Sequence, residues 1–391
     1  MKTIAHILPT YNPFPPQYPA GTELRVEQVC LRQQRYRGVV ICGGFDDQPA
    51  HETIGRMAVE RVHIGRVYRR LFQKITRFDP YPYVDRVAQR IQQQQASLIH
   101  IHNEPKLLSG LATFLQRTAL PTVVHVANEK PLPEARIKAI PQQWIACSDY
   151  IANWLINHNG IAANRVRTLY TGVDTTRLPW WQRSEQTRAA YRVAAGVPAA
   201  AHFVIGFAGR LVQEKGVQEL LDAFAQVYNQ LGPTVHLLVA GNVRESNDPR
   251  NQKAVYGRAV TERMATMPGV TWVGSLHPAS MHDFLCACDL FAMPSLWHDP
   301  FPTVMLEAAA AGIPIVAGRR GGISEFLQQV PELGLLDEPG DSVALAQALI
   351  SLLADPDRCL RIGHTLRQMV EQDYTWERVT AEFEQVYDTI L

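Results

Sequence analysis

The sequence predicts an α/β chain made of two similar domains, and three observations support this fold class. The chain has 391 residues, which suits two domains of roughly 100–200 residues each. Short apolar runs alternate with helical patterns through both halves, as is typical of parallel sheets whose strands are joined by crossover helices. The alternation is interrupted only after about residue 180, by a stretch rich in Ala, Pro and Arg.

The predicted strands are apolar runs bounded by turn residues. In the first half they are TIAHIL (3–8), GVVICGG (38–44), SLIHIH (97–102), TVVHVA (122–127) and QWIACS (143–148), with helices expected over 24–34 and 107–117. In the second half the strands are FVIGFAG (203–209), VHLLVAG (235–241), VTWVG (270–274), LFAMP (290–294) and PIVAG (314–318), with helices expected over 216–231, 281–288, 304–312 and 342–354.

These patterns divide the chain into three parts. We expect a first domain over 1–183, a second over 184–372, and a C-terminal amphipathic helix over 373–391 that packs back toward the first domain. Ligands of open α/β sheets bind beyond the carboxyl ends of the strands. The two parallel sheets should therefore face each other across a central cleft.

Charge is distributed unevenly between the halves. Residues 1–183 carry 23 Lys+Arg and 13 Asp+Glu, whereas the remainder carries 15 and 24, so a net charge of +1 hides +10 and −9. The anion-attracting surface is thus expected on the first domain. Because no zinc finger, RNA-recognition signature or basic zipper is present, we expect no nucleic-acid partner.

The six cysteines form no CxxC pair and lack histidines at zinc-binding spacing. They are expected to be reduced, buried thiols of a cytoplasmic protein without a metal. No apolar run reaches the roughly 18 residues of a membrane-spanning helix. The start of the chain, broken by Pro9, lacks the layout of a signal peptide.

Residues 65–78 form a basic amphipathic pattern. Apolar residues recur at helical spacing and are interleaved with five Lys and Arg residues. Such a helix either lies on an anionic membrane surface or packs one face while the other is solvated. A peripheral position on the inner face of the cytoplasmic membrane is therefore one of two open interpretations.

The segment FAGRLVQEKGVQELL (207–221) is the first candidate site. A strand ends at Gly209, a loop carries Arg210 and Lys215, and a helix begins near Gly216. A helix N-terminus presents unpaired N–H groups that suit a phosphate, and two cations beside it would stabilise a departing diphosphate.

The segment WHDPFPTVMLEAAAAGIPIVAG (297–318) is the second. Pro300 and Pro302 frame a tight loop, and a helix follows from Thr303 until Gly312 and Pro314 end it. Asp299 in the loop and Glu307 in the helix can accept hydrogen bonds from hydroxyl groups. Backbone N–H groups near Thr303 and Val304 suit a phosphate.

With these motifs the chain resembles the retaining glycosyltransferases of family 4. The resemblance rests on AGRLVQEKG, on the acid pair Asp299 and Glu307, on EAAAAGIPIVAGRRGGISEFL, and on LYTGVDTTRL near residue 170. It covers essentially the whole chain. It implies the GT-B fold of two Rossmann-like domains, an acceptor-side N-terminal domain, and a C-terminal domain that holds a nucleoside diphosphate sugar.

The resemblance also assigns site residues. Arg210 and Lys215 match the pair that binds the diphosphate, Glu307 matches the ribose ligand, and Asp299 matches the acid near the donor sugar. The family's donor-binding positions fall on Gly21, Gly209, Phe301, Pro302, Thr303 and Val304. Two of these depart from the pattern, because Asp299 stands for Glu and Pro302 for the usual Gly, which leaves the donor sugar open.

A third departure lies at the end of TVVHVANE (122–129). Related enzymes carry a histidine just before the Asn, facing the donor sugar, but here that position is Ala127. Either this subgroup lacks the histidine, or the chain is a variant in which it has been replaced to trap a complex, and we favour the second. His125, two positions earlier, is expected to be buried in the sheet rather than to reach the cleft.

The resulting functional hypothesis is retaining sugar transfer, from UDP-N-acetylglucosamine or UDP-glucose to a glycan or lipid-linked acceptor such as lipopolysaccharide core. No DxD-like motif is expected to serve a metal, so neither a metal nor a cofactor beyond the nucleotide sugar is expected. Two alternatives stay open: a nucleotide-sugar-binding protein without turnover, which Ala127 would explain, and a sugar-nucleotide epimerase on the same scaffold.

Overall fold

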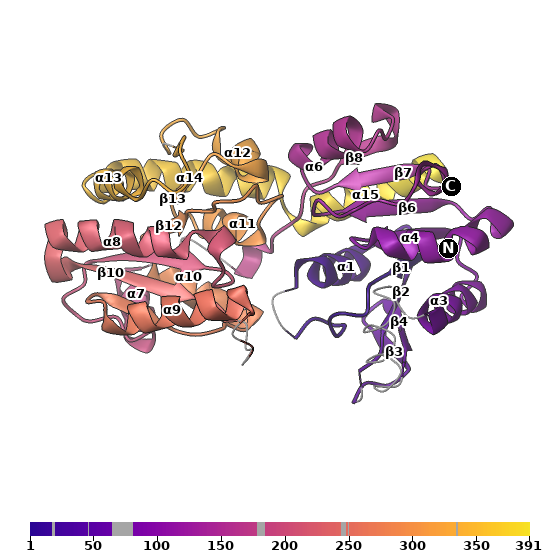
Figure 1. Ribbon diagram of the computed structural model, residues 1–391, viewed down its shortest axis with the longest axis horizontal. Helices are drawn as coiled ribbons and strands as arrows, with labels where there is room; N and C mark the ends of the chain where they lie inside the picture. The colour runs from indigo at the N-terminus through magenta and orange to yellow at the C-terminus, as the bar shows by residue number, and fades with distance from the viewer. Residues whose placement is uncertain are drawn as a thin grey trace. The chain divides into compact units, whose positions relative to one another are not determined.

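The computed structural model describes residues 1–17, 20–45, 47–64, 81–177, 184–243, 248, 250–333 and 335–391 (Figure 1). The chain forms two compact units. Unit 1 comprises Met1–Gly172 and Trp376–Leu391, and unit 2 comprises Val173–Thr375. Each unit is an α/β layer structure, as the sequence predicts.

Unit 1 is built on a sheet with eight strands in its described part, in the order β3-β4-β2-β1-β5-β6-β7-β8. All neighbouring strands are parallel except β3 and β4. The strands are β1 (Thr3–Ile7), β2 (Arg37–Gly43), β3 (His51–Ile54), β4 (Met57–Val62), β5 (Leu98–His102), β6 (Thr122–Val126), β7 (Gln143–Ala146) and β8 (Val166–Thr168). Strands β1, β5 and β6 are buried along their whole length, which is why they appear in the sequence as continuous apolar runs.

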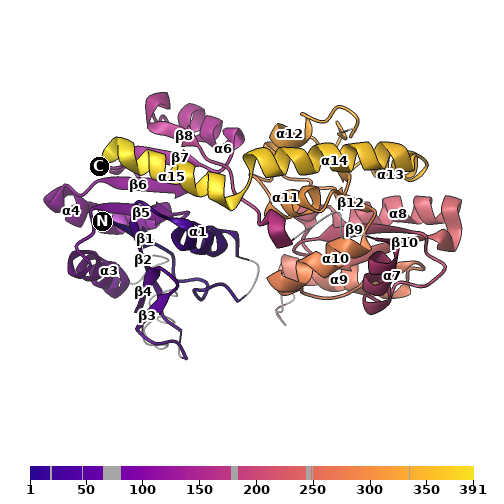
Figure 2. The ribbon, with the colours of Figure 1, turned by 180° about the vertical axis from the view of Figure 1, so that it is seen from behind.

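The helices of unit 1 cover both faces of this sheet (Figures 1 and 2). They are α1 (Gly21–Arg32), α3 (Tyr81–Gln93), α4 (Pro105–Thr118), α5 (Ala135–Lys138), α6 (Asp149–Asn153), a π-helical turn (Trp154–His158) and α15 (Trp376–Ile390). Helix α15 lies beside α1, joined to it by the Arg32–Glu377 ion pair at 2.8 Å. Its residues Phe383 and Tyr387 share one apolar cluster with Ile4 and Leu98 of the central strands. The last helix therefore belongs to the core of unit 1.

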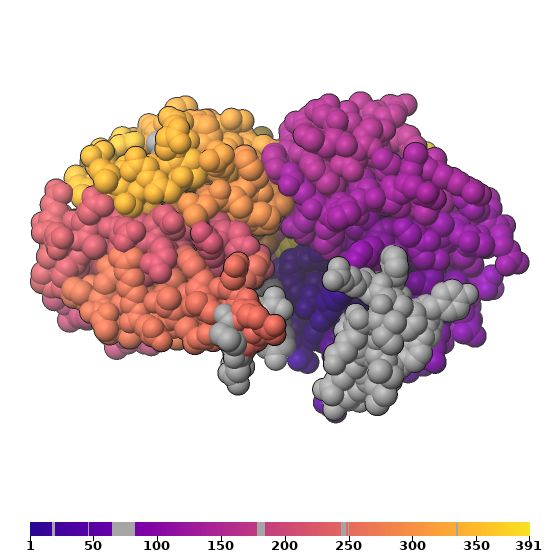
Figure 3. Space-filling model, in the orientation of Figure 1, coloured from indigo at the N-terminus to yellow at the C-terminus, as the bar shows by residue number. Residues whose placement is uncertain are grey.

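Unit 2 has a parallel sheet with five strands in its described part, in the order β11-β10-β9-β12-β13. The strands are β9 (Phe203–Ala208), β10 (Val235–Ala240), β11 (Val270–Trp272), β12 (Leu290–Met293) and β13 (Ile315–Ala317). The helices are α7 (Glu185–Ala194), α8 (Val217–Leu231), α9 (Gln252–Thr266), α10 (Met281–Ala287), α11 (Thr303–Ala310), α12 (Gly321–Leu327), α13 (Ser342–Leu353) and α14 (Pro356–Asp373). In the space-filling view the side chains of α8 and α9 cover the sheet on the face shown (Figure 3).

The units divide earlier than the composition change suggests. The structure separates them between Gly172 and Val173, about ten residues before the boundary at 183/184, and again at Thr375/Trp376. The Val173 amide donates to the Tyr374 carbonyl at 2.8 Å, and Val173 forms an isolated parallel β-bridge with Thr375. The entering and leaving strands of unit 2 are thus paired with each other, and this pairing over 200 residues has no local sequence signal.

Several elements have no counterpart in the apolar pattern. The hairpin strand β3 is HETI, which is almost entirely exposed, and β8 is short and only half-buried, whereas β11 (Val270–Trp272) lies within the strand expected over 270–274. Helices α3, α9, α12 and α14 were also not anticipated. Strands β3 and β8 bury little apolar surface, so they leave little periodicity to recognise. Helix α14 does bury an apolar face, with Ile362, Leu366 and Val370 inside, and the sequence expectations simply leave it out. Within the described residues, no helix combines the length and apolarity needed to span a membrane.

Strand order reverses once in each unit. In unit 1 the reversal falls between β1 and β5, and in unit 2 between β9 and β12. The loops beyond the carboxyl ends of such strand pairs diverge and leave room for a ligand. The loops after β1 and β5, and those after β9 and β12, are therefore where the fold favours a site.

Gly216 allows the two unit-2 loops to approach each other closely. It has φ +68°, and a Cβ added there would lie 2.0 Å from the carbonyl oxygen of Pro294, the first residue after β12. Gly196 has a similar φ of +74° but nothing within 4 Å of an added Cβ. Comparing an alanine substitution at Gly216 with one at Gly196 therefore separates the cost of left-handed backbone strain from the cost of a steric clash.

We expect Gly216→Ala to destabilise the protein by about 3 kcal/mol or more, because it adds a backbone clash to the roughly 1 kcal/mol of left-handed strain. Gly196→Ala, the matched control, should lose only the strain. Denaturant unfolding of both variants measures the difference. Equal losses would mean that the loops do not depend on the contact at Gly216.

Candidate functional site

The loops after β9 and β12 meet at the strand-order reversal of unit 2. Residues 209–216 follow β9 and residues 294–302 follow β12. The Leu296 amide donates to the Glu214 carbonyl at 3.0 Å, so the two loops are joined through their backbones. Both segments that the sequence singled out as candidate sites therefore lie together.

Lys215 and Asp299 connect these loops by an ion pair. The Asp299 residue is 5% exposed, so this carboxylate is almost fully removed from water. The Lys215 ammonium also lies 5.8 Å from the centre of the Trp297 ring. Removing one partner of a buried pair leaves the other charge uncompensated, at a cost of about 3–5 kcal/mol. The pair consequently fixes the relative position of the two loops.

Arg210 differs from Lys215 in its surroundings. Its side chain is exposed and makes no hydrogen bond or ion pair with another described residue. It lies near Glu214, since its charge contributes to lowering the pKa of that carboxyl, after the hydrogen bond from Lys253. Arg210 is thus a solvated cation beside the loop, available to an anionic ligand.

The loop after β12 is held from behind by α12. The Gly322 amide donates to the Asp299 carbonyl at 2.8 Å, and a Cβ at Gly322 would lie 1.8 Å from the Pro300 carbonyl oxygen. The Phe301 ring is buried and stacks on Tyr374, with ring centres 6.0 Å apart. The side chain of Phe301 therefore anchors the loop, so that a donor-binding role at this position would fall to its backbone.

Helix α11 begins directly after this loop. Its N-cap is Pro302, which makes no side-chain capping bond, so the first N–H groups, at Thr303 and Val304, have no cap. Unpaired N–H groups and the helix dipole favour an anion at this end. Glu307 lies one turn further along the same helix.

Glu307 is an acidic side chain in an apolar helix. Its neighbours Leu306 and Ala308 are fully buried, while Glu307 itself keeps partial exposure. Burial of the carboxyl raises its pKa to about 7. The charged form is therefore disfavoured until a hydrogen-bond donor arrives, and a pair of hydroxyl groups would be such a donor.

In unit 1, Gly21 is the first residue of α1, and Ala20 as N-cap makes no side-chain bond to the helix. Ala127 lies just beyond β6, and its amide donates to Asn103 Oδ1 at 3.0 Å. His125 is completely buried, and the Arg25 guanidinium donates to its Nε2 at 2.7 Å. The expectation that His125 is buried in the sheet is met.

A polar network at the strand-order reversal of unit 1 was not recognised among the candidate residues. It contains Tyr11 after β1, Asn103 and Glu104 after β5, and Lys130 after β6. The signal that could have revealed it is the run HNEP at 102–105, where an Asn and an acid directly follow a buried strand.

Three buried histidines lie deeper in the same sheet. The ring nitrogens of His6, His100 and His102 lie within 4.8 Å of one another, and His6 Nδ1 and His102 Nε2 share a hydrogen bond of 3.0 Å. Burial lowers the pKa of His6 to about 4, and burial followed by neighbouring charges lowers those of His100 and His102. Their spacing alone would admit a metal ion. However, the cluster contains no carboxylate, and the charge of Arg25 acts on His100 and His102, so a neutral hydrogen-bonded core describes it better.

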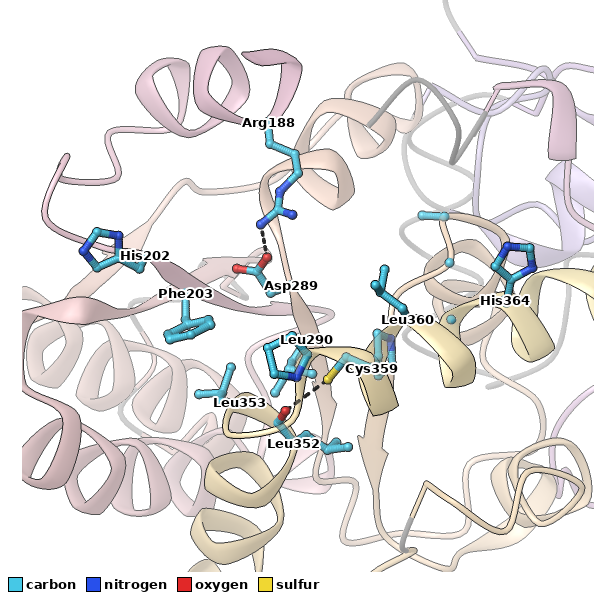
Figure 4. Close-up of a pocket in the computed structure, with 15 residues that line it drawn as sticks. Arg188, His202, Phe203, Asp289, Leu290, Leu352, Leu353, Cys359, Leu360 and His364 are labelled. Carbon is cyan, nitrogen blue, oxygen red and sulfur yellow. Dashed lines mark hydrogen bonds and ion pairs between the residues drawn. The ribbon is translucent and has the colours of Figure 1, made fainter. Parts of the chain in front are cut away.

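A cavity of about 430 Å³ lies elsewhere in unit 2 (Figure 4). Phe203 and Leu290, at the amino ends of β9 and β12, line it, and Arg188 points to Asp289 at its rim. It therefore lies at the opposite sheet edge from Lys215 and Asp299. The basic segment 65–78 falls outside the described residues.

Comparison with known proteins points to one family. Residues 29–177 match the family described as Glycosyltransferase Family 4, and residues 202–355 match that described as Glycosyl transferases group 1. The chain is 28% identical over 390 residues to the lipopolysaccharide 1,2-N-acetylglucosaminetransferase of Salmonella typhimurium, covering 98% of this chain and 97% of that protein.

Solved structures agree on the fold. Sucrose-phosphate synthase from Thermosynechococcus elongatus superposes with a TM-score of 0.80 at 21% identity, covering 100% of this chain and 99% of that one. Anabaena HepE in complex with UDP-glucose gives a TM-score of 0.77 at 21% identity, with 100% of both chains covered. The two α/β units therefore have the GT-B fold.

Glu307 generates a pH-dependent prediction. Hydroxyl groups donating to its carboxylate would favour the ionised form, so UDP should bind more tightly at pH 8 than at pH 6, by up to about tenfold per pH unit below the pKa. Glu307→Gln should weaken binding at pH 8 and remove most of this dependence. Calorimetric titration with UDP measures both effects.

The stability of the folded protein should depend on pH in the opposite direction, because it should fall as the pH rises. The pKa is raised in the folded chain, so the folded state binds more protons between about pH 4.5 and 7, and the ionised group opposes folding above pH 7. Glu307→Gln without nucleotide should therefore stabilise the protein by about 1–3 kcal/mol at pH 8 and little at pH 4.5. Glu262→Gln, at an exposed position on α9, is the control; identical pH profiles in the two variants would contradict the assignment.

Proposed function

We propose that this chain, which belongs to the family 4 and group 1 glycosyltransferases, moves a sugar from a nucleoside diphosphate donor to a glycan or lipid-linked acceptor with retention of the anomeric configuration. The observation that carries the proposal is the meeting of Lys215 and Asp299 at the strand-order reversal of unit 2, with Glu307 one turn inside the adjoining helix.

Each group of the site contacts the part of the donor that suits its chemistry. Arg210 and Lys215 are cations that stabilise the negative charge developing on the departing diphosphate, an effect larger in the transition state than in the ground state. The N-terminus of α11 adds backbone N–H groups for a phosphate. Glu307 accepts from the ribose hydroxyls, and Asp299 orients the donor sugar.

Transfer then proceeds as follows. The acceptor hydroxyl oxygen attacks the anomeric carbon from the face that the diphosphate leaves, and the anomeric C–O bond breaks with its electron pair going to the diphosphate. A departing phosphate oxygen takes the hydroxyl proton. This route needs neither a paired-carboxylate arrangement, as in retaining glycosidases, nor a metal, and we propose that the enzyme uses neither.

Donor and acceptor are proposed from the relatives. One named relative transfers N-acetylglucosamine to lipopolysaccharide, and a solved neighbour binds UDP-glucose. We therefore propose UDP-N-acetylglucosamine or UDP-glucose as donor and lipopolysaccharide core as acceptor, in the cytoplasm. Residues 65–78 are proposed to bring the enzyme to the anionic membrane surface.

Arg210→Ala should lower kcat/KM about 100- to 1,000-fold and weaken UDP binding, because it removes one cation from the diphosphate. Lys215→Ala should do the same and also leave Asp299 unpaired. Radiolabelled sugar transfer and UDP titration are the measurements. Lys253→Ala, which removes a cation paired with Glu214 at 2.7 Å in the same neighbourhood, is the control. Transfer and UDP binding that survive both site variants would disprove the phosphate assignment.

Ala127→His tests the position in unit 1 at which the family resemblance expects a histidine. If a histidine belongs at this strand end, its return should raise kcat about tenfold or more while the UDP dissociation constant stays unchanged. Single-turnover transfer assays separate an effect on the chemical step from an effect on UDP binding. An unchanged kcat would mean that the position is not used in this subgroup, and would favour alanine as its natural residue.

A further inference from the structure

We propose that Tyr11, Glu104 and Lys130 form a sugar-binding subsite for the acceptor on unit 1, in which Glu104 is the positioning residue. The inference rests on the proposed function, since it names where the acceptor glycan is held. It concerns unit 1 alone and does not involve the diphosphate-binding residues.

The three residues come from three different loops at one sheet edge. Tyr11 follows β1, Glu104 follows β5 and Lys130 follows β6. Strands β1, β5 and β6 are adjacent in the sheet, and the strand order reverses between β1 and β5. Residues far apart in sequence are thus gathered at the position where open α/β sheets bind their ligands.

Glu104 holds the other two side chains in place. Its Oε2 accepts from Tyr11 Oη at 3.1 Å and from Lys130 Nζ at 3.2 Å. Its Oε1 faces the Lys106 amide at 3.4 Å, as the N-cap of α4. The Glu104 side chain is only 5% exposed. Its oxygens are engaged within the protein, so Glu104 acts through its neighbours rather than on a ligand.

Tyr11 and Lys130 present the surface that a ligand would meet. Tyr11 is 53% exposed, and it is one of the few large hydrophobic side chains open to water in the part of the chain that the structure describes. Lys130 keeps 32% of its side chain exposed, and its ammonium also donates to the Asn103 carbonyl at 2.6 Å. An ammonium has three donor hydrogens, of which these two contacts use two.

This combination matches the chemistry of a pyranose. A sugar ring has an apolar face of C–H groups, which packs against an aromatic ring, and a rim of hydroxyls, which accept from an ammonium. Because the Tyr11 hydroxyl and the Lys130 ammonium both bind one buried carboxylate, the aromatic ring of Tyr11 and the ammonium of Lys130 are held in place before the ligand arrives. Such preorganisation reduces the entropy lost on binding.

Asn103 makes the arrangement rigid. Its φ of +48° is left-handed, a conformation that Asn tolerates better than most residues. Its amide donates to the His125 carbonyl at 2.7 Å, its Oδ1 accepts from the Ala127 amide, and its Nδ2 faces Thr22 Oγ1 at 3.4 Å. The subsite is thereby tied to Ala127, a position that the family resemblance assigns to the reaction, and to Thr22, the residue after Gly21.

The first experiment measures saccharide binding without turnover. Saturation-transfer NMR with methyl hexopyranosides and with lipopolysaccharide core oligosaccharide should show contact with the wild-type protein. Tyr11→Ala should abolish at least 80% of the signal, and Tyr11→Phe, which keeps the ring but loses its tether, should abolish less. Tyr36→Phe is the matched control, because it removes a phenol–carboxylate bond, to Asp388, just before the amino end of β2 and therefore at the other edge of the sheet. Absence of signal in the wild type, or an undiminished signal in Tyr11→Ala, would overturn the subsite.

The second experiment separates positioning from general stability. With core oligosaccharide as acceptor, Glu104→Gln and Lys130→Met should raise the acceptor KM about tenfold while kcat and the UDP dissociation constant change less than twofold. Equal losses in kcat and UDP binding would assign Glu104 a structural role only and overturn its positioning role. Arg210→Ala distinguishes the two proposals: it should keep saccharide binding while losing UDP. If UDP binds neither the wild type nor Arg210→Ala, yet the saccharide signal depends on Tyr11, then the assignment of the nucleotide donor fails and the saccharide subsite stands.

Discussion

The Lys215–Asp299 ion pair is the interaction on which the candidate site of unit 2 depends. It joins the loop after β9 to the loop after β12, and its carboxylate is nearly excluded from water. A buried pair of this kind adds little net stability, yet it is costly to break, so it fixes geometry more than it stabilises the fold. Gly216 and Gly322 permit the backbone approaches that bring the two charges together.

A similar device recurs in unit 1. There a lysine and a nearly buried carboxylate, Lys130 and Glu104, also join loops at a strand-order reversal. In both units the carboxyl edge of a parallel sheet supplies diverging loops, and an acid–lysine pair holds them. The difference is in what remains available. Unit 2 leaves cations and helix N–H groups, which suit phosphate, whereas unit 1 leaves an aromatic face and an ammonium, which suit a sugar.

Glu307 shows how an apolar environment prepares a binding group. Its helix is apolar because it packs between the sheet and α14, and burial therefore raises the pKa of the one acid it carries. A carboxyl that is reluctant to ionise gains most from hydroxyl donors, so ligand binding and proton release are coupled. A ligand that offers hydroxyl donors to Glu307 is therefore favoured over one that does not.

Much of this protein is determined by local sequence. The buried strands are continuous apolar runs, and the segments around Arg210 and Asp299 carry chemistry that is recognisable one residue at a time, because loop, helix start and charge are adjacent in the chain. Tertiary structure alone decided the rest. The boundary at Val173 depends on pairing with Tyr374 and Thr375, and the network of Tyr11, Glu104 and Lys130 depends on which strands are neighbours. Strand order is set by packing over the whole domain rather than by local propensity, so contacts across it leave no periodicity in the sequence that could reveal them.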